Sequence, residues 1–339
     1  MPADDWLDEN LEAIAQLSTP PKVSRPSLWV TVVTLLPFAV LLSWMTGWGW
    51  EQTALIVVLV VIHEAGHLIA KKAFGYTDLQ LFFIPFIGAA VSGRKDDASQ
   101  VQRALVALAG PLPSVIVSGA YLIAFHRGLL GPSEPNEYLQ YPLGVRIAVI
   151  TLIINGFNLI PLGPLDGGQF FSAILFSRRP WMDTACKIAA VAALVFIGIG
   201  SVWISFGIAA FMVMTLQDTH NIAVMSSKLR AAGLNQDPSV ETMPLERLMQ
   251  SYALTRQVIP DSGNKSLEYR VALRAGLLQR AYPGALAQPA SASWVALLMA
   301  LYLTVGGLGG YAWYLHDKGV KAAEEQRQEE ANEHQFKIY

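Results

Sequence analysis

The sequence predicts an all-α polytopic membrane protein with about seven transmembrane helices, a short membrane-associated β-hairpin and a small helical soluble domain. Of its 339 residues, 53% are hydrophobic and only 15% are charged, whereas soluble domains carry about 25% charged residues. The apolar residues gather in runs close to the roughly 20 residues that a helix needs to cross a bilayer. Lysine and arginine are abundant in alternate connecting segments, as the positive-inside rule expects.

Charge and cysteine content narrow the range of partners. The net charge is −2, and the sequence has no basic stripe of the kind that nucleic-acid binders carry. We therefore expect a lipid bilayer as partner and no nucleic acid. The single cysteine, Cys186, allows no intrachain disulfide and no zinc site built from several thiolates.

Residues 1–27 are expected to form an amphipathic N-terminal segment on the cytoplasmic surface. Acidic residues stand where a cleavable signal peptide carries basic ones, so we expect no such signal here. Apolar residues recur at helical spacing at Leu7, Leu11, Ile14 and Leu17.

Apolar runs of single-span length follow at residues 28–50, 53–70, 104–125, 145–162 and 294–315. The run 187–216 is too long for one ordinary helix, and Gly198, Gly200 and Ser201 offer a break. Two crossings there give seven spans and one crossing gives six.

The placement of basic residues orients the chain. Lysine and arginine cluster near residues 71–103 and 178–187, so we expect these segments and the N-terminus in the cytoplasm. The predicted parts after residue 27 are a membrane-embedded core at 28–218, a helical cytoplasmic domain at 219–292, a transmembrane helix at 293–316 and a polar tail at 317–339. The domain at 219–292 could bind a regulator or substrate, or only support the bundle.

The second predicted span contains the pattern His63-Glu64-Ala65-Gly66-His67. Residues four apart share one helical face, so both imidazoles can reach one zinc ion. Zinc lowers the pKa of a bound water toward about 7, and Glu64 can take that proton and pass it to a leaving amine. The alternative is a buried polar network that stabilises helix packing, although such a network does not require this spacing.

A second group of polar residues lies where the fourth span ends. Prolines and glycines interrupt the helix around Asp166, and irregular backbone at membrane depth is tolerated only where protein or water covers it. Asp166 is therefore the candidate third zinc ligand, with capping of the following helix as its alternative role. Asn158 could donate a hydrogen bond to a developing oxyanion or to substrate backbone, or could bond between helices.

The segment 79–91 after the histidines has the composition of strands. We hypothesise a membrane-associated hairpin whose edge pairs with an unwound substrate, with Leu81, Phe83 and Pro85 as contact residues. The alternative is a loop that only packs against the bundle.

Together these motifs resemble the site-2 protease family of zinc intramembrane metalloproteases, over roughly residues 50–218. The resemblance rests on His63-Glu64-x-x-His67, on Asn158-x-x-Pro161-x-x-Pro164-Leu165-Asp166-Gly167, and on Gly110-Pro111-Leu112-Pro113-Ser114, where the family usually has Gly-Pro-x-x-Asn. It implies one zinc per chain held by His63, His67 and Asp166, with Glu64 as general base and Asn158 as a transition-state or substrate contact.

The family resemblance also implies regulated cleavage of membrane-anchored proteins or peptides, and we expect the active site toward the cytoplasmic side. Neither a PDZ domain nor a CBS pair is evident, so neither mode of regulation carries over. Two other function classes remain: a catalytically silent membrane scaffold, and a metal-binding transporter.

Overall fold

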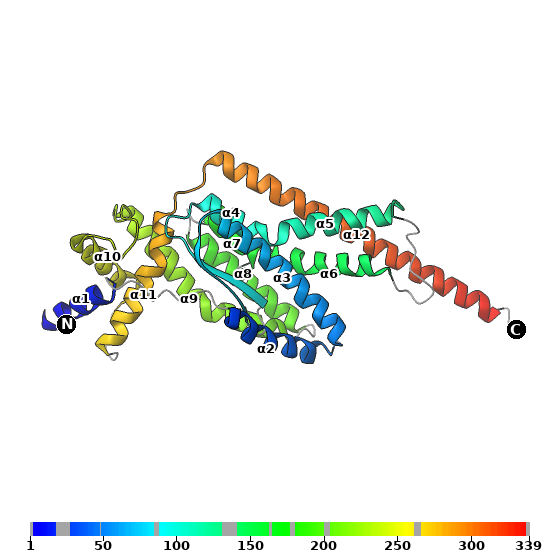
Figure 1. Ribbon diagram of the computed structural model, residues 1–339, viewed down its shortest axis with the longest axis horizontal. Helices are drawn as coiled ribbons and strands as arrows, with labels where there is room; N and C mark the ends of the chain where they lie inside the picture. The colour runs from blue at the N-terminus through cyan, green and yellow to red at the C-terminus, as the bar shows by residue number, and fades with distance from the viewer. Residues whose placement is uncertain are drawn as a thin grey trace.

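The computed structural model describes residues 3–17, 28–47, 49–84, 88–130, 141–162, 165–176, 180–199, 204–260 and 266–336. These residues are mostly helical, and the two ends of the chain lie at opposite ends of an elongated molecule (Figure 1). The elements in chain order are α1 (Ala3–Leu17), α2 (Leu28–Thr46), α3 (Trp50–Ala73), β1 (Thr77–Ile84), β2 (Gly88–Arg94), α4 (Gln100–Ala109), α5 (Pro111–His126), α6 (Leu143–Asn158), α7 (Asp166–Ile174), α8 (Pro180–Ile199), α9 (Ile204–Ala231), α10 (Leu245–Val258), α11 (Leu267–Leu286) and α12 (Ala292–Phe336).

Within the described ranges, α3 and α12 are the two helices long and apolar enough to cross a membrane. The pair α4 and α5 is a third candidate, bent by 41° at Gly110, which lies between the end of α4 at Ala109 and the start of α5 at Pro111. The predicted count of about seven spans is therefore not confirmed. One reason is helix length: the 16 residues of α6 rise only about 24 Å, against a hydrocarbon core of about 30 Å.

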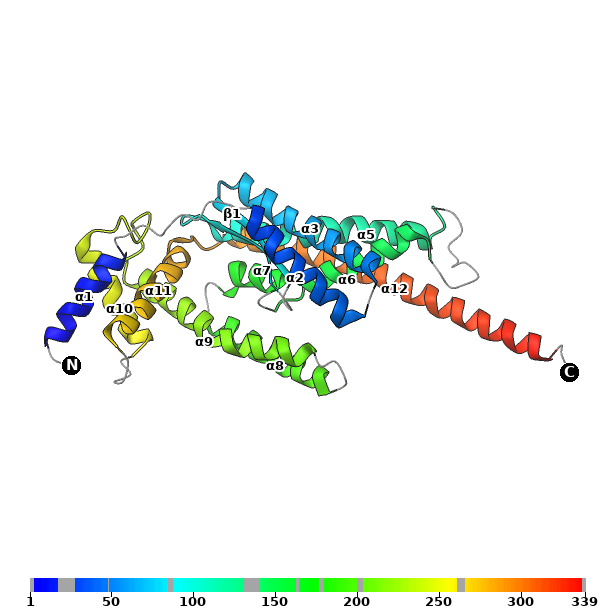
Figure 2. The ribbon, with the colours of Figure 1, turned by 60° about the horizontal axis from the view of Figure 1, so that its bottom comes forward.

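The apolar run predicted at 187–216 divides into two helices. Helix α8 ends at Ile199 and α9 begins at Ile204, and the two run side by side (Figure 2). Helix α9 then continues to Ala231, so the domain boundary predicted at residue 219 falls inside a helix. The boundary predicted between the last span and the tail likewise falls inside α12. No proline stands at either point, so polarity changes along the chain while the helix continues.

The predicted hairpin is present as strands β1 and β2, paired antiparallel with Leu81 opposite Val91. Its outer edges are covered on both sides. The Thr31 hydroxyl of α2 donates to the Leu81 carbonyl at 2.6 Å, and the Phe83 N–H donates to the Thr34 hydroxyl at 3.0 Å. On the other edge, Lys71 of α3 donates to the Val91 carbonyl. The hairpin is thus held between α2 and α3.

The helices at the N-terminal end of the molecule form a second hydrophobic core (Figure 1). Helices α10 and α11 occupy the segment predicted to be helical, and the end of α9 packs with them. Helix α1 packs on the same core through Ala13 and Leu17, which are fully buried. Of the apolar face predicted for α1, Leu17 is buried in this core and Ile14 packs against it, whereas Leu11 is 59% exposed.

Candidate metal centre

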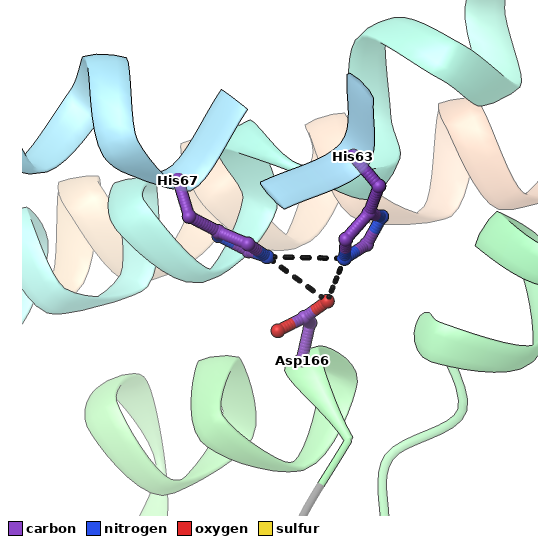
Figure 3. A group of neighbouring side chains, drawn as sticks. All are labelled: His63, His67 and Asp166. Atoms are coloured by element: carbon purple, nitrogen blue, oxygen red, sulfur yellow. Dashed lines mark hydrogen bonds and ion pairs between the residues drawn. The ribbon is translucent and has the colours of Figure 1, made fainter. Parts of the chain in front are cut away.

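Two buried histidines of α3 and one buried aspartate of α7 converge on one point (Figure 3). The Nε2 atoms of His63 and His67 lie 3.1 Å apart. The Asp166 Oδ2 atom lies 3.0 Å from Nε2 of His63 and 3.3 Å from Nε2 of His67. All three residues are less than 10% exposed. The two motifs that are about 100 residues apart in the sequence therefore meet, as the metal hypothesis requires.

The outer nitrogens of both imidazoles have fixed partners. The Val106 carbonyl can only accept, so Nδ1 of His67, 2.8 Å away, carries the proton. The Asn155 amide donates to the Thr151 carbonyl at 2.8 Å, which leaves the Asn155 oxygen to accept from Nδ1 of His63 at 2.7 Å. In neutral imidazoles both Nε2 atoms then carry lone pairs, and both face Asp166.

This arrangement is one that a cation stabilises. Three electron-pair donors lie within about a hydrogen-bond length of each other, and Oδ2 of Asp166 is buried with no hydrogen-bond donor among the described residues. Tetrahedral zinc with ligands at about 2.0–2.1 Å sets its ligand atoms about 3.3 Å apart, close to the observed spacing. Two imidazoles and a carboxylate are also a ligand set found in catalytic zinc sites. The residues therefore fit zinc.

Close backbone contacts at glycines position the three side chains. A β-carbon at Gly66 would collide with the Ala109 backbone, so α3 can approach the end of α4 only with glycine there. A β-carbon at Gly110 would collide with the His67 ring. At Gly167 it would collide with the carbonyl oxygens of Leu159 and Ile160, which brings α7 against the end of α6. Each contact places a ligand-bearing segment within reach of the others.

Asp166 is the first residue of α7, and its side chain does not cap the helix. Leu165 occupies the N-cap position, and no side-chain capping bond is present. The turn before it is closed by a bond from the Leu165 N–H to the Leu162 carbonyl at 2.8 Å. Gly163 and Pro164, part of the predicted irregular segment, lie outside the described residues. The capping alternative for Asp166 thus finds no support in the side-chain contacts.

The other predicted site residues lie at different distances from this centre. Glu64 is 6% exposed and follows His63 on α3. Asn158 bonds through its amide to Ile154 in its own helix at 3.1 Å, and no hydrogen bond joins it to the three converging residues. The asparagine that contacts the centre is Asn155, one turn earlier, which the sequence analysis did not single out. The sequence feature that could have identified Asn155 is that it is a second asparagine in the apolar run 145–162.

The predicted substrate contacts lie on the hairpin. Leu81 accepts the Thr31 hydroxyl through its carbonyl, and the Phe83 ring is 2% exposed and packs 5.4 Å from the ring of Phe38. Pro85 lies outside the described residues. In this arrangement the outward backbone groups of Leu81 and Phe83 bond to α2, and the Phe83 ring is buried.

Fold and site together define a helical protein with candidate membrane spans, a buried two-histidine, one-carboxylate centre, and a glutamate beside the first histidine. The chain is similar to Peptidase family M50, whose model matches residues 52–140. The matched range includes His63, Glu64 and His67 and ends before Asp166.

Proteins with known names are similar to parts of this chain. The chain is 32% identical over 139 residues to a zinc metalloprotease of Methanocaldococcus jannaschii, covering 40% of this chain and 37% of that protein. It is 24% identical over 182 residues to stage IV sporulation protein FB of Bacillus subtilis, covering 54% and 57%. The solved structure of the site-2 protease from Methanocaldococcus jannaschii aligns at 25% identity over 56% of this chain and 88% of that chain, with a TM-score of 0.40. The chain thus spans less than two thirds of the length of the two curated relatives, 37% and 57%.

Proposed function

We propose that this chain is an intramembrane zinc metalloprotease that cleaves membrane-anchored proteins or peptides, with its active site toward the cytoplasmic side. The observation that carries the proposal is the convergence of two imidazole lone pairs and one carboxylate, with a glutamate next to the first imidazole. The similarity to Peptidase family M50 and to a zinc metalloprotease supports the same chemistry. The cytoplasmic placement rests on the basic residues of the connecting segments.

His63, His67 and Asp166 would hold the zinc ion. Bound zinc supplies an acidified water and polarises the peptide carbonyl. Glu64 accepts the proton of the attacking water and delivers it to the leaving nitrogen, which requires only that its carboxylate faces the same pocket. Asn155 and Val106 keep both Nε2 atoms unprotonated and aimed inward.

Substrate binding is proposed at the outer edge of β1. An extended peptide can add a strand to an exposed sheet edge, and the edge groups at Leu81 and Phe83 are now bonded to threonine side chains of α2. Pairing therefore requires that α2 release these groups. Such a step would admit an unwound substrate beside the metal helix.

The decisive experiment separates metal binding from turnover. His67→Ala should lose the zinc, whereas Glu64→Gln should retain one zinc per chain and lose cleavage of co-expressed membrane proteins. Glu51→Gln, a carboxylate on the exposed start of the same helix, is the matched control and should keep both. Substrates would be found by mass spectrometry of membrane proteins trapped by Glu64→Gln.

The two other function classes give different results in this experiment. A metal transporter would lose transport with His67→Ala and little with Glu64→Gln. A silent scaffold would bind the same partners in wild type and Glu64→Gln, with no shortened product in either. Either pattern would end the protease proposal.

A further inference from the structure

Helix α12 contacts the helix that carries Asp166, far from it in sequence. The Tyr302 ring lies stacked on Phe170 of α7, with ring centroids 5.2 Å apart and planes at 6°. It also meets Phe171 edge to face, at 5.2 Å and 88°. Phe170 is fully buried and stands one turn after Asp166 on α7. Tyr302 therefore packs against both aromatic residues in the first two turns of this helix.

The Tyr302 hydroxyl contacts the same structure from a second direction. It donates to the Leu159 carbonyl, at the C-cap of α6. Carbonyls at a helix end lack an intrahelical partner, so a side-chain donor satisfies one there. The same Leu159 oxygen is one of the two that would collide with a β-carbon at Gly167, the residue after Asp166. The hydroxyl thus holds the backbone surface against which the Asp166 turn is seated.

We propose that Tyr302 is a positioning residue for the metal centre, because it fixes the end of α6 and the start of α7 relative to each other and thereby sets the reach of the Asp166 carboxylate. This inference rests on the proposed function, since it assumes that Asp166 binds the metal. It assigns to the C-terminal helix, which lies outside the family match at residues 52–140, a part in building the site.

The geometry explains why both parts of the side chain are needed. The stacked ring sets the lateral position of α7, and the hydroxyl sets its distance from α6. The two histidines are supported separately, by Asn155 and by Val106. A change at Tyr302 should therefore act on the carboxylate ligand and leave the imidazole pair in place.

The first test measures metal binding by the full chain in detergent, with Co²⁺ as the probe. Tyr302→Phe keeps the ring and loses the hydroxyl. We expect Co²⁺ affinity to fall about three- to tenfold, below the roughly 10–100-fold seen for direct partners of ligands, together with a shift of the visible cobalt bands. Tyr314→Phe, an exposed tyrosine on the same helix, is the control and should change neither.

A second test distinguishes positioning from general packing. The effect of Tyr302→Phe on Cu²⁺ affinity is measured with Asp166 present and in the Asp166→Ala background. Cu²⁺ binds such sites most tightly among the divalent ions, so the two remaining imidazoles still give a measurable affinity. If Tyr302 acts through Asp166, its effect disappears when the carboxylate is absent.

The possible results separate the two proposals. Unchanged Co²⁺ affinity and spectrum in Tyr302→Phe, or an equal loss of Cu²⁺ affinity in both backgrounds, would overturn the role of Tyr302 while wild-type zinc binding and cleavage stand. If His67→Ala and Asp166→Ala each bind metal as tightly as the wild-type chain, the proposed function and this inference are both overturned.

Discussion

Residues outside the histidine motif set the tautomers of His63 and His67 in which both Nε2 atoms carry lone pairs. Each Nδ1–H has an acceptor: the Asn155 side chain for His63 and the Val106 backbone for His67. A backbone carbonyl cannot be changed by substitution, but the asparagine can. The two supports therefore differ in how a mutation can test them.

Replacing Asn155 should weaken the metal centre. Asn155→Ala removes the acceptor for His63 Nδ1–H in a buried site, so the ring can rotate or adopt the other tautomer. We expect metal affinity to fall about 10–100-fold, measured by chelator competition. Asn158→Ala is the matched control, because Asn158 bonds only within its own helix among its described hydrogen bonds, and it should leave the affinity intact. Wild-type affinity in Asn155→Ala would refute this support.

The same pair of asparagines marks how far the sequence predicts the site. Spacing alone put His63 and His67 on one face, and the break at Asp166 indicated a cavity at matching depth. Which of two asparagines three residues apart faces α3 depends on the rotation of α6 about its axis. That rotation is set by packing against α5 and α12, which the sequence does not reveal.

At the scale of elements, the hairpin is confirmed but its edge is not open. In an antiparallel pair, alternate residues direct their backbone groups away from the partner strand, and Leu81 and Phe83 are two of these. The composition of 79–91 predicts strands. It does not predict that hydroxyls from α2, about 50 residues earlier, occupy their outward groups.

Removing those hydroxyls should favour the substrate. Thr31→Val and Thr34→Val remove the hydroxyl bonds to the Leu81 carbonyl and the Phe83 N–H, so a peptide no longer competes with α2 for these groups. The Gln80 amide still donates to the Leu81 carbonyl at 2.8 Å. One hydrogen bond contributes about 0.5–1.5 kcal/mol, so KM for a membrane-anchored substrate should fall by up to about tenfold with little change in kcat. Thr46→Val, whose hydroxyl bonds to Leu42 in its own helix, is the control. A raised KM would contradict this expectation and would indicate that the two threonines keep the edge of β1 in the conformation that binds substrate.

Helix boundaries are a further limit on prediction. The sequence divides 187–216 at its glycines, and in the structure α8 ends at Ile199 and α9 begins at Ile204. Polarity changes near residues 219 and 317 were interpreted as domain boundaries, yet α9 and α12 run through both. A helix ends where its backbone is interrupted, and α9 continues until the left-handed Gly233, at φ +68°. A change in side-chain polarity therefore indicates a change in the surroundings of a helix. The end of the helix depends on residues, such as glycine and proline, that interrupt its backbone.

At the scale of the whole molecule, the helical domain is tied to the hairpin. Arg94 at the end of β2 pairs with Glu241 at 3.1 Å, and Arg103 donates to the Pro283 carbonyl at 2.9 Å. These contacts join the end of β2 and the first turn of α4 to the segment between α9 and α12. The domain is therefore connected directly to β2, the strand that pairs with β1.

The N-terminal helix is fastened to that domain by a buried charge cluster. Glu9 of α1 is fully buried and lies 2.6 Å from Arg274, which is 1% exposed, and Arg256 and Arg270 approach it at 3.5 and 3.7 Å. The Tyr252 hydroxyl also donates to Glu9 at 3.0 Å. Burial, then the Glu9 charge, raise the pKa of Tyr252, so it remains a neutral donor. One carboxylate thus balances several guanidinium groups.

Glu9→Gln should therefore detach α1 and destabilise the domain. The change leaves a buried guanidinium without its counter-charge, and breaking one partner of a buried ion pair costs about 3–5 kcal/mol. Glu12→Gln, three residues on in the same helix and only partly buried, is the matched control and should cost well under about 1 kcal/mol. Hydrogen exchange of the full chain in detergent measures both effects. Detachment of α1 is expected to lower protection in α1, and destabilisation of the domain is expected to lower it along the buried face of α11. If α1 exchanges as slowly in Glu9→Gln as in wild type, the helix is held by Ala13 and Leu17 alone, and the charge cluster serves only the interior of the domain.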